Sequence, residues 1–429
     1  MRVLMFGWEF PPHIAGGLGT ACYGMTRGLA ENGVEVLFVM PSASGDEDQS
    51  SVRIINASDV AVDTMSETVD EFLGKVRFVH VGTNMVPYVS PEDFSSVVEE
   101  ERARQIKDFR ITYGQKYQFS GKYGTNLMEE VARYGMVGGT IALQHCDEFD
   151  VIHAHDWLTY LAGIAAKQLT GKPLVVHVHA TSFDRSSDDN IDTRVYDLEK
   201  RGMEAADRVI TVSELTRNIV INKYGIDPAK VVTVHNAVDF SGRAGITVQR
   251  GVKDKIVTFL GRVTYQKGPE YFIEAAAKVL KRCDNVRFVM AGSGDMLNRC
   301  IRHVARLGIA DRFHFTGFLR EDDVRKMFAL SDVYVMPSIS EPFGISPLEA
   351  MQTNVPSIIS KQSGCAEVLK YALKVDFWDV DAMSDAIYGL LNYPALSDFA
   401  TRCGYDEVNA LKWTAAAAKV KAVYESVAK

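Results

Sequence analysis

Short apolar runs separated by amphipathic stretches organise the N-terminal part of the chain. Residues 2–8 form an apolar run, a turn-rich stretch follows, and residues 20–31 have a helical pattern that ends at Asn-Gly before a second run at 34–41. Short apolar runs bounded by turn signals are typical of buried strands. Similar runs recur at 149–155, 173–180, 206–213 and 231–237.

The same pattern restarts after a polar, glycine-rich interval. The later runs lie at 255–262, 286–292, 312–317, 332–337 and 355–360. Strands that alternate with helices at this spacing favour parallel sheets. The chain is therefore expected to be an α/β protein with two doubly wound, Rossmann-like domains, residues 1–237 and 254–410, joined by a hinge at 238–253 and followed by a last helix at 411–429.

The segment 42–144 interrupts this rhythm. It holds an acidic, helix-like stretch and an aromatic, glycine-rich stretch at 111–124. A segment of this length is too long for a plain loop. It is interpreted as an insertion that forms a helical or hairpin elaboration of the first domain.

Composition narrows the class of protein. The chain has 429 residues, of which 47% are hydrophobic and 24% charged, which suits two cores. The sequence predicts a soluble, unprocessed, cytoplasmic protein, because it has no long apolar run and no basic leader at its N-terminus. The six cysteines have no C-x-x-C spacing, which favours reduced, structural thiols.

The charge is uneven between the two halves. Asp and Glu outnumber Lys and Arg by 11 in residues 1–237, whereas Lys and Arg are in excess by 3 in the rest. The first half is therefore not expected to bind nucleic acid or an anionic membrane, and the second half could hold an anion.

Glycines follow the first predicted strand. Gly16, Gly17 and Gly19 precede a helix, where backbone amides can approach a ligand. A dinucleotide site is not expected, because the spacing differs from G-x-G-x-x-G and the run at 34–41 ends without an acidic residue. The alternative is a tight structural turn.

Two strands each carry a pair of histidines. His153 and His155, like His177 and His179, are two positions apart and so share one face of a strand. They could converge on a metal, but no acidic or cysteine ligand has a matching spacing. Hydrogen bonding to backbone or substrate is the favoured alternative, and no metal site is expected.

Two cations flank a turn after the strand at 255–262. Arg262 and Lys267 precede Pro269, a residue favoured at the first position of a helix. A planar guanidinium and a point-charge ammonium together suit a diphosphate. The alternative is a pair of solvated surface cations.

Two glutamates lie eight positions apart in "SISEPFGISPLEAM". Ser346 and Glu349 fit a capping box, with Pro347 at the first helical position, so capping alone would explain Glu349. It does not explain Glu341. Paired carboxylates also occur in glycoside hydrolases, but a hydrolase gains nothing from nearby cations, whereas transfer from a nucleotide diphosphate does.

Nine segments in this order resemble the retaining GT-B glycosyltransferases of family 4 and the related glycogen and starch synthases. They are WEFPPHIAGGLG (8–19), VIHAHDW (151–157), ADRVITVSE (206–214), TVHNAVD (233–239), LGRVTYQKG (260–268), AGSGDM (291–296), FTGFL (315–319), EPFGISPLEAM (341–351) and LKWTAAAAKVKAVYE (411–425). The resemblance implies two domains that face a deep cleft, with the last helix crossing back to the first domain.

The resemblance also implies roles for single residues. Glu341 would contact the donor sugar, Glu349 the ribose, and Arg262 with Lys267 the diphosphate. The other donor-binding residues would be Gly16, Gly17, Gly292, Thr316, Gly317, Phe318, Phe343, Gly344 and Ile345. The acceptor side would hold Glu9, His155 and Asp156, with His155 beside the anomeric carbon, so the catalytic set would be His155, Arg262, Lys267 and Glu341.

One difference between this chain and the family concerns the nucleotide of the donor. Bacterial ADP-glucose glycogen synthases carry a lysine two residues before the first glycine, where this chain has Ile14. The expected reaction is retaining transfer of glucose from a nucleotide sugar, ADP- or UDP-glucose, to a carbohydrate acceptor such as an α-glucan, without cofactor or metal. The alternatives are a small-sugar acceptor, as in sucrose synthesis, a lipid-linked or cell-surface glycan, or a noncatalytic protein that binds sugar nucleotides. An oligomer is compatible with the sequence.

Overall fold

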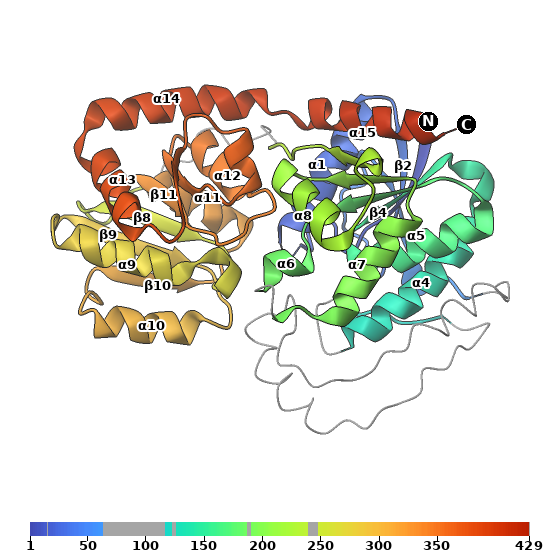
Figure 1. Ribbon diagram of the computed structural model, residues 1–429, viewed down its shortest axis with the longest axis horizontal. Coiled ribbons are helices and arrows are strands. Elements are labelled where there is room, and N and C mark those ends of the chain that lie inside the picture. The colour runs from blue at the N-terminus through green and yellow to red at the C-terminus, as the bar shows by residue number, and fades with distance from the viewer. Residues whose placement is uncertain (15, 63–115, 122–125, 187–189, 239–247, 429) are drawn as a thin grey trace, which may run out of the picture. The chain divides into compact units, whose positions relative to one another are not determined.

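A computed structural model describes all residues except 15, 63–115, 122–125, 187–189, 239–247 and 429. The chain divides into two compact units, and Figure 1 labels their elements. Unit 1 comprises Met1–Phe183, Ser187–Asn236 and Trp413–Lys429, and unit 2 comprises Asp184–Ser186 and Ala237–Lys412. Each unit contains a parallel sheet with helices, so the expected α/β class is confirmed.

Unit 1 is built on a seven-stranded parallel sheet. Its strands are β1 (Arg2–Phe6), β2 (Glu35–Met40), β3 (Arg53–Asn56), β4 (Val151–His155), β5 (Leu174–Val178), β6 (Arg208–Thr211) and β7 (Val231–Thr233). Their order is β3-β2-β1-β4-β5-β6-β7, so the direction of winding reverses between β1 and β4. In a doubly wound sheet such a reversal places ligand-binding loops at the carboxyl ends of those strands.

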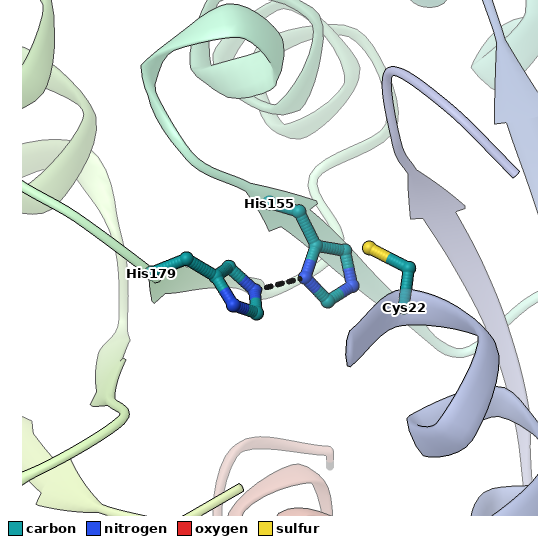
Figure 2. Close-up of side chains that lie close together, drawn as sticks. All are labelled: Cys22, His155 and His179. Carbon is teal, nitrogen blue, oxygen red and sulfur yellow. Dashed lines mark hydrogen bonds between the residues drawn. The ribbon is translucent and has the colours of Figure 1, made fainter. Parts of the chain in front are cut away.

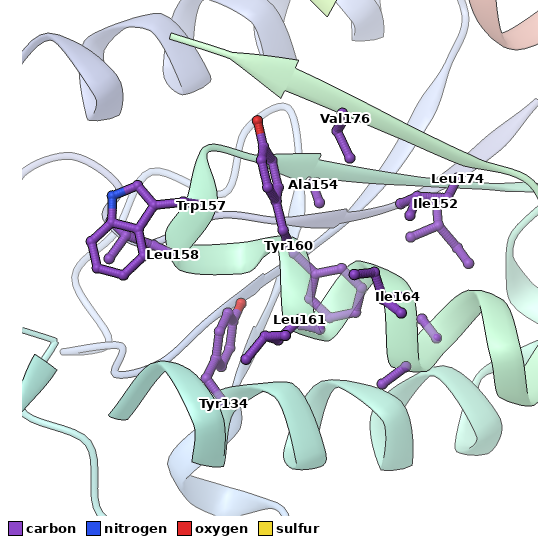
Figure 3. Packing of buried hydrophobic residues seen from close by; sticks show 14 of the residues in the cluster. Tyr134, Ile152, Ala154, Trp157, Leu158, Tyr160, Leu161, Ile164, Leu174 and Val176 are labelled. Atoms are coloured by element: carbon purple, nitrogen blue, oxygen red, sulfur yellow. The ribbon is translucent and has the colours of Figure 1, made fainter. Parts of the chain in front are cut away.

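A large hydrophobic core covers one face of this sheet. It is contributed by the helices α4 (Leu127–Gln144), α5 (Trp157–Thr170), α7 (Thr193–Ala205) and α8 (Glu214–Tyr224). Figure 3 shows part of this core, with labelled side chains from α4, α5, β4 and β5. Because neighbouring residues of a strand point to opposite faces, Ile152 and Ala154 enter this core and His153 and His155 point the other way.

Two helices that are far apart in the sequence pack together in unit 1. They are α1 (Gly17–Glu31) and α15 (Trp413–Val427). A Cβ atom on Gly24 would lie 2.2 Å from the Trp413 ring, and one on Gly28 would lie 2.5 Å from the Trp413 carbonyl oxygen. The glycines of α1 therefore allow α15 to approach closely.

The segment 42–144 is not an insertion throughout. β3 pairs in parallel with β2, and α4 packs against α5 in the core. Both were expected to belong to the elaboration, but the run Arg53–Asn56 is short and only partly buried, and α4 is rich in glycine and alanine, so neither has a strong strand or helix signal. The acidic helix-like stretch lies outside the described residues, as does part of the aromatic stretch.

Unit 2 contains a six-stranded parallel sheet. Its strands are β8 (Lys255–Leu260), β9 (Val286–Ala291), β10 (Phe313–Gly317), β11 (Val333–Met336), β12 (Ser357–Ser360) and β13 (Leu373–Val375), in the order β10-β9-β8-β11-β12-β13. The winding reverses between β8 and β11. Residues that follow these two strands are therefore the first to examine for ligand binding.

The helices of unit 2 complete its core. They are α9 (Pro269–Leu280), α10 (Leu297–Arg306), α11 (Glu321–Leu330), α12 (Ser346–Gln352), α13 (Val380–Asn392) and α14 (Pro394–Ala410). Side chains of α9, α10 and α13 form one buried cluster with the strands. Within the described residues, no helix is both long and apolar enough to cross a membrane.

The chain passes between the units more than once. Unit 1 ends at Asn236 and resumes at Trp413, and most of the predicted hinge, 239–247, lies outside the described residues. The short helix α6 (Ser182–Arg185) also lies at a boundary between the units. Each unit is described by itself below.

Candidate active site

The turn after β8 brings two cations to the carboxyl end of the unit 2 sheet. Arg262 lies two residues after the end of β8, and Lys267 ends the short 3-10 helix η5 (Tyr265–Lys267). Gly268 then adopts φ 62°, and a Cβ atom there would lie 2.2 Å from the Pro337 carbonyl oxygen. Glycine is needed at this position, because it allows α9 to begin against the end of β11.

Glu341 and Lys267 form an ion pair of 2.5 Å between Oε2 and Nζ. The lysine side chain is 19% exposed and the glutamate side chain 9%. The Ser338 hydroxyl also donates to Glu341 Oε2, at 3.1 Å. A buried charge is tolerated when it is paired and hydrogen-bonded, so this pair fixes both side chains at the strand ends.

Gln266 connects Arg262 to the same loop. The guanidinium donates to Gln266 Oε1 at 3.4 Å, and Gln266 Nε2 donates to the Ser340 carbonyl at 3.1 Å. Arg262 also lies close enough to Asp295 to favour its ionised form, although burial, the larger effect, raises the pKa of that carboxyl. The two predicted cations and Glu341 are thus brought together.

The Ser346 half of the expected capping box at α12 is not formed. Ile345 is at the N-cap position, its side chain makes no capping hydrogen bond, and the Glu349 amide donates to the Ile345 carbonyl at 3.1 Å. The Ser346 hydroxyl instead accepts a hydrogen bond from Tyr334, at 2.9 Å. The sequence pattern was misleading because the helix starts at Ser346 itself, which leaves its hydroxyl free to meet the buried tyrosine of β11.

In the loop before α12, one residue is held by burial and another allows the backbone to turn. Phe343 is buried, and its carbonyl accepts from the Cys365 amide at 2.7 Å. Gly344 has φ 93°, and a Cβ atom there would lie 3.1 Å from Glu341 Cγ. Ile345 precedes the helix. The aromatic ring therefore anchors the loop, and the glycine lets the backbone turn beside Glu341.

Four of the residues expected to bind the donor lie at the ends of β9 and β10. The Gly292 amide donates to the Gly317 carbonyl at 2.8 Å, and Gly292 lies against the backbone of Gly261. Thr316 is exposed, and the Phe318 side chain is 64% exposed. These four residues and the cations after β8 therefore occupy neighbouring strand ends of one sheet.

In unit 1, the glycines at the start of α1 are open. A Cβ atom on Gly16 or Gly17 would have no neighbour within 4 Å. Gly19, by contrast, is in close contact with Ile14. Glu9 is buried and accepts from the Gly19 amide at 3.0 Å, so it has a structural role at the first turn of α1 in addition to its predicted place on the acceptor side.

The four histidines of unit 1 stack in one group. Ring centroids of His153 and His155 are 4.3 Å apart, as are those of His177 and His179. His155 Nδ1 and His179 Nε2 are 2.9 Å apart, and His153 Nδ1 hydrogen-bonds the Tyr424 hydroxyl of α15 at 2.5 Å. The prediction that each pair shares a strand face is confirmed.

Burial makes these imidazoles neutral. It lowers the pKa of His155 and His177 well below the usual value, and neighbouring histidines lower it further. Burial also lowers the pKa of His153 and His179 to about 3, with the nearby His179 adding to the effect at His153. At neutral pH each ring therefore carries one proton and offers one lone pair.

Asp156 connects the ends of β4 and β5. Its φ of 57° is unusual for a residue other than glycine. Its Oδ1 accepts from the backbone amides of His179, at 2.6 Å, and Ala180, at 3.4 Å. These hydrogen bonds hold the strained residue and fix the position of His179 relative to β4.

Three polar side chains at these sites were not identified from the sequence. Ser338 and Gln266 orient the charged groups of unit 2, and Cys22 of α1 lies beside His155 in unit 1, as Figure 2 shows. Serine and glutamine in loops carry no signal of their own. Cys22 was assigned a structural role because ligand spacing was sought along the sequence, whereas α1 brings it to the histidines in space.

Comparisons with known proteins identify the family of the chain. The pattern of the family "Starch synthase catalytic domain" matches residues 2–234, and that of "Glycosyl transferases group 1" matches residues 247–406. An uncharacterized glycosyltransferase of Methanocaldococcus jannaschii is 30% identical over 86% of this chain and 83% of its own.

More distant relatives cover nearly the whole chain. A glycogen synthase of Mycobacterium tuberculosis is 23% identical over 99% of this chain and 94% of its own. The structure of sucrose-phosphate synthase from Thermosynechococcus elongatus has a TM-score of 0.69 at 18% identity and covers 99% of this chain and 98% of its own. The chain therefore belongs to the GT-B glycosyltransferases that are similar to glycogen and starch synthases, and it is an enzyme of that family.

Proposed function

We propose that this glycosyltransferase moves glucose from a nucleotide diphosphate to a growing α-glucan chain, with retention of the anomeric configuration. The observation that carries the proposal is the buried Lys267–Glu341 pair beside Arg262 at the strand ends of unit 2. A paired carboxylate and two cations suit a ligand that joins a neutral sugar to a diphosphate.

The two cations have a direct role in this chemistry. As the bond between C1 of the sugar and the diphosphate breaks, its electron pair moves to a phosphate oxygen. Arg262 and Lys267 would stabilise that developing negative charge, and one such preorganised group is commonly worth ~3 kcal/mol. Their orientation by Gln266 and Glu341 means that little reorganisation is needed during the reaction.

Glu341 has one oxygen to offer to the sugar. Lys267 and Ser338 both donate to Oε2, and within the described part of the chain no group hydrogen-bonds Oε1. A carboxylate oxygen accepts readily from hydroxyl groups, so Oε1 is suited to a hydroxyl of the donor sugar. Glu341 would therefore recognise the sugar with one oxygen and hold Lys267 with the other.

The proposed transfer needs no carboxylate nucleophile. An acceptor hydroxyl forms the new bond to C1 on the face from which the diphosphate leaves, and its proton moves to the leaving phosphate oxygen. His155, whose ring is neutral, would line the acceptor side without adding a charge next to the positively charged sugar. Arg262 and Lys267 supply the positive charge, so the mechanism includes no metal.

Two acceptor classes fit the relatives. The matches to starch synthase catalytic domains and to glycogen synthase favour an α-glucan. The similarity to sucrose-phosphate synthase favours a small sugar as the second candidate. The donor is expected to be ADP-glucose or UDP-glucose, and Ile14 in place of lysine removes one phosphate contact that ADP-glucose glycogen synthases have.

The experiment that tests the proposal has two stages. ADP-, UDP- and GDP-sugars are first screened for thermal stabilisation of the full chain. The donor that stabilises most is then incubated with maltooligosaccharides or with small sugars and sugar phosphates, and the anomeric configuration of the product is determined by NMR.

Each outcome bears on one part of the proposal. Elongated maltooligosaccharides with a new α-linkage would support it, and transfer only to small sugars would favour the second candidate. A β-linked product from an α-linked donor would contradict retention. Donor binding without transfer or hydrolysis for any acceptor class would favour a noncatalytic protein that binds sugar nucleotides.

A further inference from the structure

The histidine group of unit 1 leaves several buried nitrogens without a hydrogen bond. They include His155 Nε2 and His179 Nδ1. The 2.9 Å contact between His155 Nδ1 and His179 Nε2 uses one proton and one lone pair, so each ring still has a second, unpartnered nitrogen. A buried polar atom without a partner costs roughly 1–3 kcal/mol and therefore calls for an explanation.

A thiol lies on the other side of His155. Figure 2 shows Cys22 of α1 next to the His155 ring, with His179 on the opposite side. One potential ligand atom from each of the three residues lies within 4.8 Å of the other two. Tetrahedral zinc, with bonds of about 2.1 Å to nitrogen and 2.3 Å to sulfur, separates its ligand atoms by roughly 3.3–3.7 Å. Binding would therefore require the three side chains to rearrange toward that geometry.

We propose that unit 1 binds a soft transition-metal dication of the zinc class through Cys22, His155 and His179. Thiolate and neutral imidazole are the ligands that Zn²⁺ prefers, and three protein ligands leave a fourth position for water or another small ligand. This site shares His155 with the proposed acceptor side, so a bound dication would occupy that side and oppose the proposed transfer, whereas metal binding itself is measured without the reaction.

The charges around the thiol favour a cation. Glu9 and Asp156 lie close enough to Cys22 to raise the pKa of its thiol, although burial contributes more. The same two carboxylates would attract a dication to this position. Asp156 also accepts from the His179 backbone amide, so one of the ligands is held in place before any metal arrives.

A second histidine group is less suitable. His153, His155 and His177 also have ligand atoms within 4.8 Å of one another. All three side chains are fully buried, and His153 is already bonded to the Tyr424 hydroxyl. His179, by contrast, is partly exposed and has no bond to Tyr424, so the group with Cys22 is the better candidate.

Metal binding can be tested with the full chain, free of a histidine tag and freed of metal with a chelator. Zn²⁺ is titrated by calorimetry, and Co²⁺ is titrated by absorption spectroscopy, because a cobalt–thiolate bond gives a charge-transfer band in the near ultraviolet. We expect one equivalent of Zn²⁺ per chain and a cobalt spectrum with that band.

Variants identify the ligands. Cys22→Ser should abolish the thiolate band, and His179→Gln should weaken Zn²⁺ binding by more than the roughly 10–100-fold loss typical of an outer-shell change. Cys283→Ser and His145→Gln are matched controls outside the group and should bind as the unaltered chain does. Because His179 is partly exposed, His179→Gln provides a test even if Cys22→Ser does not fold.

Three results would overturn the proposal. They are the absence of Zn²⁺ binding at micromolar concentration, a cobalt spectrum without the thiolate band, and binding by His179→Gln that equals that of the unaltered chain. Equal loss of binding in His145→Gln would place the metal elsewhere and would overturn it too.

Discussion

The strand ends of the two sheets differ in their chemistry although both sheets are doubly wound and parallel. In unit 1 they carry four stacked, neutral imidazoles, and in unit 2 they carry the Lys267–Glu341 ion pair beside Arg262. Burial explains both arrangements, because a buried charge is unfavourable. An imidazole avoids the buried charge by losing a proton, whereas lysine and glutamate stay charged by forming an ion pair. The same type of sheet can therefore present a neutral surface or a charged one.

The largest expected effect is a loss of turnover when the cations of unit 2 are removed. Arg262→Ala and Lys267→Ala should each lower turnover about 100-fold, because each removes a preorganised positive charge from the leaving diphosphate. Steady-state kinetics with the best donor measures the effect, and thermal unfolding reports on the fold. Lys278→Ala, which removes an exposed ion pair with Asp381 in the same unit, should leave turnover unchanged.

Near-normal turnover in both variants would mean that these cations do not act on the diphosphate. Lys267→Ala also leaves the Glu341 carboxylate without its ion-pair partner, so some loss of stability is expected there. Arg262→Ala leaves the Lys267–Glu341 ion pair in place and removes a hydrogen bond to Gln266, so it tests the diphosphate role without unpairing that carboxylate.

The next effect tests the packing that covers the imidazoles of unit 1. In Gly28→Ala the new methyl group would lie 2.5 Å from the Trp413 carbonyl oxygen, so α1 and α15 must move apart. Overpacking of this kind typically costs about 1–3 kcal/mol, measurable as the free energy of unfolding in urea. Gly251→Ala, where the methyl group has no neighbour within 4 Å, is the control. Equal stability of both variants would show that the helix contact is not rigid.

Lowering the pH tests whether the imidazoles of unit 1 are neutral in the folded chain. The pKa of His153 is about 3 in the folded chain, mainly because of burial, against about 6.5 when unfolded. Between these pH values only the unfolded chain binds the proton, so the stability present above pH 6.5 falls as the pH is lowered. Lowering the pH from 7 to 5 should cost on the order of 1–2 kcal/mol for this residue.

Urea unfolding at the two pH values measures this loss. The groups that face His153 are His155 of its own strand, His177 of β5, His179 just after β5, and Tyr424 of α15. His153→Gln removes the titrating ring and should show a smaller loss. An equal loss in that variant would assign the acid sensitivity to other groups.

The smallest effect concerns Glu349 of unit 2. Glu349→Gln keeps the shape of the side chain but removes its charge, so donor affinity should fall about tenfold, or ~1.4 kcal/mol, while stability changes little. Calorimetric titration with the nucleotide measures the affinity. Unchanged affinity would show that Glu349 does not bind the ribose.

The sequence predicted much of this architecture because buried parallel strands have a strong local signal. The runs at 2–8, 149–155 and 255–262 each contain an observed strand. β3 was missed because an edge strand of four residues, one exposed and three partly buried, has little hydrophobic pattern. Family resemblance located Glu341 and Lys267, but their direct bond is a contact over 74 positions that no local pattern encodes.

Two site features depended on three-dimensional packing. The prediction that the Ser346 side chain caps α12 was wrong, because its hydroxyl accepts a hydrogen bond from Tyr334, twelve residues earlier. Cys22 reaches His155 only because α1 lies against the face of the sheet where the histidines point. Spacing along the sequence predicts contacts within a helix or a strand, and it is silent on contacts between them.

The return of α15 to unit 1 determines how the protein can be divided. Unit 1 is not a single continuous segment, because Trp413–Lys429 belongs with residues that end at Asn236. A recombinant fragment that stops at Asn236 would lack Tyr424, so His153 would lose its hydrogen bond and the face of the sheet beneath α15 would be open to water. A single backbone cleavage after Asn236, by contrast, would leave the two fragments associated. The C-terminal fragment contains α15, which packs against α1 of the N-terminal fragment.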